Sequence, residues 1–289
     1  MRYIKTYNEI EESKLSKFLW GAGIIATIGL NLYKYFSKTD TEYLMEQMKK
    51  QESLPTLVIK NRIDSLKKTL IDEINLNPMY KDRDIMIDSI KSIPIYFVNL
   101  NRISDKPSGV NIIFDNKDIK RCVIFIEKNN KDGNDNLTIS RNILHELYHF
   151  IVHFQKIDFT NIIDKKTLTD DKRLLEKVCL IYGKFHTYDE LKSSKEIEKS
   201  MIKMQKLIKK EKDYLTSNDE LSTRILNMRN FLKTKGLIKN TFDDLKESDL
   251  IYLVNNWTKD KTNEYDHFMR ILPFIQFDKL FTIKDLENK

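Results

Sequence analysis

The pattern of apolar and polar positions predicts helices on both sides of a short β region. Apolar residues recur at helical spacing within residues 40–76. Three runs rich in β-branched and aromatic residues then follow, separated by polar turns: Ile95–Leu100, Val110–Phe114 and Cys122–Ile126. The next helix is expected to begin at Thr138 or Ser140 and to end near Gln155, and everything after Asp170 has helical periodicity. This order predicts an α+β fold, with a small meander and a mostly helical C-terminal half.

An uncharged segment near the start departs from this pattern. Phe18–Tyr33 carries no charge and is bracketed by Lys17 and Lys34. A helix of this length spans about 24 Å, and snorkelling lysines with flanking aromatic residues extend that reach toward a hydrocarbon core of about 30 Å. We therefore expect an N-terminal hydrophobic helix that spans a membrane over residues 18–33, in an orientation left open because basic residues flank both ends. A buried hairpin or an oligomerisation helix is the alternative.

Two parts of the chain follow from these patterns. The first is an N-terminal segment, residues 1–39, and the second is a domain over residues 40–289. Within this domain we expect helices over 40–92, the sheet and one further helix over 93–156, and helices again over 157–289.

Composition narrows the function classes. The chain has 289 residues, of which 40% are hydrophobic and 32% charged, which is typical of a globular protein. Its net charge of +7 is spread without an arginine-rich stripe, so no nucleic-acid partner is expected. The two cysteines, Cys122 and Cys179, exclude a disulfide framework and a cysteine-based zinc site.

The candidate chemistry lies in the stretch HELYH at positions 145–149. Three of the chain's five histidines, His145, His149 and His153, fall within nine residues that begin with this stretch. On a helix, His145 and His149 lie one turn apart on the same face, so both imidazoles can reach one zinc ion. Glu146 lies about 100° around the helix, where it can serve as general base to a zinc-bound water but not as a third ligand. A pair of ordinary surface or core histidines is the alternative.

This H-E-x-x-H stretch resembles the zincins, a class of zinc metallopeptidases, over roughly residues 94–156. The resemblance implies a short sheet packed on the motif helix and an edge strand that binds the substrate backbone, for which Cys122–Ile126 is the candidate. It also implies that His145 and His149 bind zinc and that Glu146 is catalytic.

The third zinc ligand needs a separate argument. His153 lies about 12 Å along the helix axis from His145, too far to share one ion, so we expect it to pack or to support a ligand. The metzincins solve this problem with a glycine turn, but Val152 stands at that position here.

Gluzincins, another zincin subgroup, take a glutamate from a later helix, and two glutamates fit. Glu220 lies with Tyr214 and Arg224 in a Y-x(5)-E-x-x-x-R pattern similar to that of phage-type metallopeptidases. Glu176 has a spacing from the motif that resembles ImmA/IrrE-type metallopeptidases, as does the string HELYHFIVH. Glu220 flanks the apolar stripe of its helix whereas Glu176 points nearly opposite to its stripe, so Glu220 is favoured and Glu176 stays the alternative.

Together these residues predict a zinc-dependent metalloendopeptidase of gluzincin type that acts on protein or peptide substrates. Zn²⁺ would be held by His145, His149 and Glu220, while Arg224 or Tyr214 would stabilise the oxyanion. A peptidase specific for one regulatory partner, as in ImmA/IrrE-like proteins, is equally compatible.

The alternative is a catalytically inactive structural, virion or membrane-tethered protein that retains the fold. The opening residues MRYIKTYNEIEES resemble head-targeting propeptides of T-even-like phage internal proteins, which keeps a virion origin open. We expect a membrane-associated protein, with a virion or cytoplasmic location as the alternatives.

Overall fold

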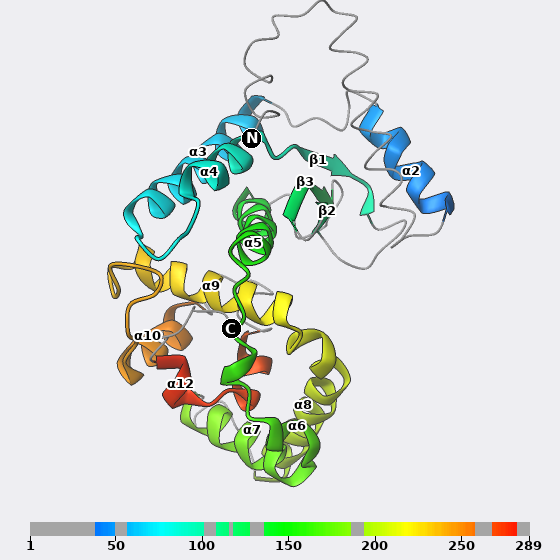
Figure 1. The fold of residues 1–289 in the computed structure, drawn as a ribbon. Coiled ribbons are helices and arrows are strands. Elements are labelled where there is room, and N and C mark those ends of the chain that lie inside the picture. The colour runs from blue at the N-terminus through cyan, green and yellow to red at the C-terminus, as the bar shows by residue number, and fades with distance from the viewer. Residues whose placement is uncertain are drawn as a thin grey trace, which may run out of the picture. The chain divides into compact units, whose positions relative to one another are not determined.

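The structure, a computed structural model, describes residues 38–49, 57–100, 108–115, 118–127, 136–185, 194–257 and 268–281 (Figure 1). The chain divides into two compact units, one comprising Met1–Asp64 with Ile93–Ile143 and the other Ser65–Ser92 with Leu144–Lys289. The predicted membrane span over residues 18–33 lies outside the described residues. Among the residues that are described, no helix is long and apolar enough to cross a membrane.

The first unit contains a three-stranded sheet made of β1 (Ile95–Val98), β2 (Ser108–Asp115) and β3 (Asp118–Glu127). The strand order is β1-β3-β2, in which β3 pairs parallel with β1 and antiparallel with β2. The predicted meander is therefore wrong, because β3 returns between the two earlier strands. The expectation that Cys122–Ile126 forms an edge strand is wrong for the same reason: both edges of β3 are already paired, so it has no free backbone edge for a peptide.

Helix α2 (Lys38–Lys49) completes the core of this unit. Its apolar residues pack with those of β1 and β3 in one buried cluster, which consists of Leu44, Met48, Val98, Leu100, Val123 and Phe125. The remaining apolar residues of β3 from Cys122 onward are buried too, so both faces of this strand are covered. Strands with parallel neighbours are usually buried on both faces. This burial explains why Cys122–Ile126 is a continuous apolar run instead of an alternating one.

The second unit is helical in its described part. Together with the sheet of the first unit, this confirms the predicted α+β class and the helical C-terminal half. Its elements are the end of α3 (Leu57–Leu76), α4 (Arg83–Ser92), most of α5 (Asn136–Gln155), α6 (Lys165–Thr169), α7 (Asp171–Phe185), α8 (Ser194–Leu215), α9 (Asn218–Thr234), α10 (Glu247–Trp257) and α12 (Phe277–Phe281), with short 3₁₀ turns at Thr160–Ile162 and Leu272–Phe274. Packing of the sheet on α5 stays a prediction.

Helix α5, which carries the HELYH stretch, ends at Gln155 as predicted but begins earlier than expected. Its first residue is Asn136, so Thr138 and Ser140 lie inside the helix instead of capping it. The side-chain amide of Gln155 fixes the C-terminal end of α5, because it accepts from the backbone N–H of Lys81 at 2.9 Å and donates to its carbonyl at 2.7 Å.

Helix α9 is the central helix of the second unit, where Figure 1 shows it between α5 and the α7–α8 pair. Every residue from Glu220 to Arg229 is buried. The Arg229 guanidinium donates to the backbone carbonyls of Thr241, Asp243 and Leu280, and thereby ties two later segments to α9. Burial lowers the pKa of Arg229 to about 10, but the guanidinium stays charged at neutral pH.

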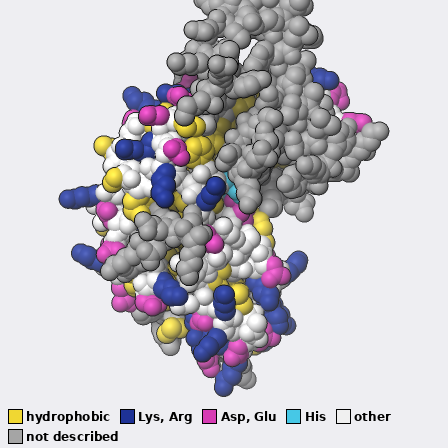
Figure 2. All heavy atoms as spheres, in the orientation of Figure 1, with side chains coloured by type: hydrophobic (Ala, Val, Ile, Leu, Met, Phe, Trp, Pro, Cys, Tyr) yellow, Lys and Arg dark blue, Asp and Glu magenta, His cyan; other side chains and the backbone are white. Residues whose placement is uncertain are grey.

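The surface agrees with the charge pattern of the sequence. On the face drawn in Figure 2, Lys and Arg side chains are interspersed with Asp and Glu side chains and do not gather by sign.

Candidate metal centre

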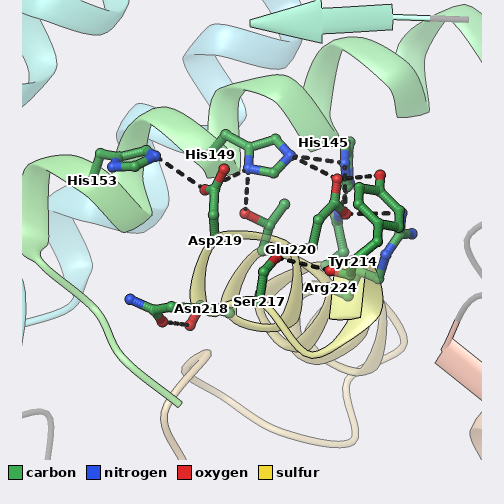
Figure 3. A network of polar contacts seen from close by, with 12 residues as sticks. His145, His149, His153, Tyr214, Ser217, Asn218, Asp219, Glu220 and Arg224 are labelled. Atoms are coloured by element: carbon green, nitrogen blue, oxygen red, sulfur yellow. Dashed lines mark hydrogen bonds and ion pairs between the residues drawn. The ribbon is translucent and has the colours of Figure 1, made fainter. Parts of the chain in front are cut away.

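The two motif histidines converge as the helical spacing predicts. His145 and His149 are 6% and 5% exposed, and both rings turn toward α9 (Figure 3). Their Nε2 atoms lie 3.1 Å apart, with the rings edge to face. Two buried imidazoles that aim the same ring nitrogen at one point are arranged as ligands of a single ion.

Glu220 supplies the third donor from the first turn of α9. Its side chain is buried, with Oε2 3.8 Å from Nε2 of His145 and Oε1 3.8 Å from Nε2 of His149. A carboxylate at this end of a helix is stabilised by the unpaired N–H groups of the first turn. Ligand atoms of the three residues all lie within 4.8 Å of one another, so His145, His149 and Glu220 form a buried group that could hold a metal ion.

The geometry of this group fits a small divalent ion. Two ligand atoms that each lie about 2.1 Å from a tetrahedral metal are separated by about 3.4 Å. The observed separations of 3.1 and 3.8 Å lie on either side of that value. In addition, Oε2 of Glu220 is buried and accepts no hydrogen bond from any described residue, so it keeps a lone pair for an ion.

Two residues brace the Glu220 carboxylate. Tyr214 donates its hydroxyl to Oε1, and the buried Arg224 places Nη2 3.0 Å from Oε2 as an ion pair. Burial alone would raise the pKa of Glu220, but the charge of Arg224, the two histidines and the Tyr214 hydrogen bond more than offset it, and the pKa lies below its ordinary value. The pKa of Tyr214 is raised, by burial and by the charge of Glu220. Glu220 is thus ionised and Tyr214 is a donor at neutral pH.

The other ring nitrogens of both histidines contact α9. Nδ1 of His149 lies 2.8 Å from Oδ1 of Asp219 and 3.0 Å from Oγ1 of Thr223. Nδ1 of His145 lies 3.0 Å from the side-chain amide nitrogen of Asn227. An amide nitrogen donates and does not accept, so a proton on Nδ1 of His145 requires the amide turned over, with its oxygen toward the ring. Each ring is therefore held from behind, which leaves both Nε2 atoms facing Glu220.

Sequence reasoning missed the residues behind the histidines. Asp219, Thr223 and Asn227 recur every four residues, so they form one polar row along α9 beside the row of Glu220 and Arg224. A polar row next to an apolar stripe on the helix of Glu220 was the signal available in the sequence.

The remaining candidates take different places. Glu146 is buried on α5, outside the three-residue group. His153 is not one of the three ligands either, and its Nε2 lies 3.1 Å from Oδ1 of Asp219. Glu176 is exposed on α7 and does not join this group, so the structure brings Glu220 and not Glu176 to the two histidines.

Comparisons of this chain with protein-family models, with curated proteins and with solved structures gave no match. The function is therefore inferred from the geometry of the site itself.

Proposed function

We propose that this protein is a zinc-dependent metallopeptidase with its metal held by His145, His149 and Glu220. The observation that carries the proposal is the convergence of two buried imidazoles and one buried, ionised carboxylate on a single point. The sequence adds a second carboxylate, Glu146, directly after the first histidine. This combination of three donors and an adjacent acid is what metal-assisted hydrolysis requires.

The donor set favours zinc in a catalytic site. Two histidines and one carboxylate are a common set for zinc, and three protein ligands leave the fourth tetrahedral position open, whereas structural zinc sites use four protein ligands. When bound, zinc would polarise a substrate carbonyl and lower the pKa of a water molecule at that open position.

Glu146 is the residue we assign to proton transfer. As a carboxylate it would accept a proton from the attacking water and then deliver it to the amine of the cleaved peptide bond. Glu146 directly follows His145 on α5, so it lies about 100° around the helix from that histidine. Its side chain is buried, as are those of the two histidines.

Two roles remain, support of the third ligand and stabilisation of the oxyanion, and Arg224 and Tyr214 are the candidates for them. Arg224 is almost fully buried on Oε2 of Glu220, so its role would be to hold the third ligand. Tyr214 is 36% exposed and carries its hydroxyl at the edge of the same carboxylate. We therefore assign the oxyanion role to Tyr214, whose single hydroxyl proton would turn from Oε1 of Glu220 to the oxyanion. Attachment to a membrane through residues 18–33 stays a prediction.

The test compares the full chain with Glu146→Gln, and uses Glu176→Gln as a matched control on an exposed helix face. Zinc content is measured by elemental mass spectrometry and hydrolysis with a denatured protein substrate. We expect about one zinc per chain in all three proteins. Only Glu146→Gln should lose hydrolysis, by about 10²–10⁴-fold.

Equal hydrolysis by Glu146→Gln with zinc retained would contradict the mechanism. Wild-type protein that binds zinc but cleaves no substrate would instead favour the catalytically inactive, structural alternative.

A further inference from the structure

The third histidine of HELYHFIVH is unexplained by the proposed centre. His153 follows His149 by one turn of α5, and its Nε2 lies 3.1 Å from Oδ1 of Asp219. The same Oδ1 lies 2.8 Å from Nδ1 of His149. A single carboxylate oxygen therefore lies between the two imidazoles, as Figure 3 shows.

The contact on His149 decides which ring nitrogen is available to a metal. An imidazole can ligate through Nε2 only when its proton is on Nδ1. An ionised carboxylate accepts hydrogen bonds and donates none, so Asp219 selects the form of His149 that carries the proton on Nδ1. It also fixes the rotation of the ring, which aims Nε2 at the point shared with His145 and Glu220.

The contact on His153 holds the carboxylate in that position. The side chain of Asp219 is 42% exposed, so water competes for its oxygen atoms and the rotamer facing His149 needs support. His153 is itself 34% exposed and lies on the same helix face as His149, one turn away. It gives Asp219 a second partner that is fixed to the ligand helix.

We propose that Asp219 is the positioning residue of the metal centre, and that His153 acts through Asp219 instead of binding the metal. The inference deepens the proposed function and rests on its metal centre, but it does not depend on peptide hydrolysis. Each of the three histidines in HELYHFIVH then has a defined place: two ligands, and one residue that holds the carboxylate behind the second ligand.

The experiment measures zinc affinity by competition with a chelator in the full chain. Its variants are Asp219→Ala, Asp219→Asn, His153→Ala and the double variant Asp219→Ala/His153→Ala. Asp213→Ala, which removes an exposed carboxylate on α8, is the matched control. The absorption spectrum of the Co²⁺-loaded protein reports the ligand geometry, and the melting temperature of the metal-free protein reports folding.

Asp219→Ala should weaken zinc binding about 10–100-fold and alter the Co²⁺ spectrum. Asp219→Asn should recover part of the affinity, because its amide oxygen still accepts from Nδ1 of His149. His153→Ala should weaken binding less, by about 2–10-fold, and should add nothing in the Asp219→Ala background, because it acts only through that carboxylate. Asp213→Ala should match the wild type.

Unchanged zinc affinity and spectrum in Asp219→Ala would overturn the positioning role. An equal loss from His153→Ala with and without Asp219 would overturn the claim that His153 acts through it. Failure of the wild type to bind zinc would be a different result, because it would remove the metal centre itself.

Discussion

Two buried carboxylates in the second unit look alike at first and differ in one respect. Asp164 and Glu220 are both largely buried, both lie beside a cation, and both have a pKa below the ordinary value. Asp164 caps α6 through the backbone N–H of Lys166. It also accepts from Thr167 at 3.0 Å and from Arg173 and Lys177 at 2.8 Å each. Donors from the chain itself saturate this carboxylate.

Glu220 has acceptor capacity left over. Arg224 and Tyr214 hold its two oxygens, yet both histidine Nε2 atoms stay at 3.8 Å, beyond hydrogen-bond distance. Its Oε2 accepts no hydrogen bond from the described residues. Burial and a neighbouring cation are therefore common to both carboxylates. They differ in that only Glu220 lies beside two further potential metal ligands with an oxygen that accepts no hydrogen bond from the described residues.

The largest difference between the two carboxylates is expected in zinc affinity. Glu220→Gln replaces a charged ligand by a weakly coordinating amide, and we expect at least about a hundredfold loss of affinity. Asp164→Asn touches no ligand, so its affinity should stay within about threefold of the wild type. Competition with a chelator measures both. Equal losses in the two variants would mean that Glu220 holds no metal.

The next effect is on stability in the presence of zinc. Free zinc at about a hundred times its dissociation constant should raise the free energy of unfolding by about 2.7 kcal/mol, because the ion binds only the folded chain. Denaturant titrations with zinc and with a chelator measure this increment. Asp164→Asn should start from a lower stability and gain the same increment, whereas Glu220→Gln should gain almost none. An increment in Glu220→Gln as large as in the wild type would contradict the assigned ligand set.

At acid pH the larger effect on stability is expected at Asp164 and not at Glu220. Burial alone would raise the pKa of Asp164, but its bonds to Lys177, Arg173 and Thr167 more than offset this and lower it below 3.8. The unfolded chain therefore binds more protons in acid. The contribution of Asp164 to the free energy of unfolding is complete above about pH 4 and is lost as pH falls toward the native pKa.

Asp164→Asn should accordingly lower the free energy of unfolding by about 2 kcal/mol at pH 7, through the loss of charge-assisted hydrogen bonds. It should also flatten the fall in stability below pH 4. Denaturant titrations of the metal-free protein between pH 3 and 7 test both. A slope as steep as that of the wild type would show that other carboxyl groups dominate acid unfolding.

The smallest effect is expected at Glu176. Its exposed position on α7 predicts that Glu176→Gln changes stability by less than about 0.5 kcal/mol and leaves zinc affinity unchanged. Weaker zinc binding in this variant would restore Glu176 as the third ligand.

Much of the site was predictable because it depends on local periodicity. The i, i+4 spacing of His145 and His149 places both rings on one helix face wherever the helix goes. The same reasoning favoured Glu220 by its place beside an apolar stripe, and it excluded His153 by distance along the helix axis. In each case a few residues of helix geometry were enough.

The errors are of two kinds, one in strand pairing and one in a helix boundary. The order β1-β3-β2 depends on which strand pairs with which, and the apolar runs do not encode it. The start of α5 at Asn136 was missed as well, because two cap residues inside a helix give the same sequence signal as true caps.

The sequence by itself determined the donor types, their spacing on one helix and the α+β class, since these follow from residue chemistry and local backbone periodicity. Only the tertiary structure decided that Glu220 and not Glu176 joins the two histidines, that Asp219 lies between His149 and His153, and that β3 is central. These features arise where segments about 70 residues apart, or neighbouring strands, come together. Such contacts are set by the packing of whole helices and strands, which local sequence does not specify.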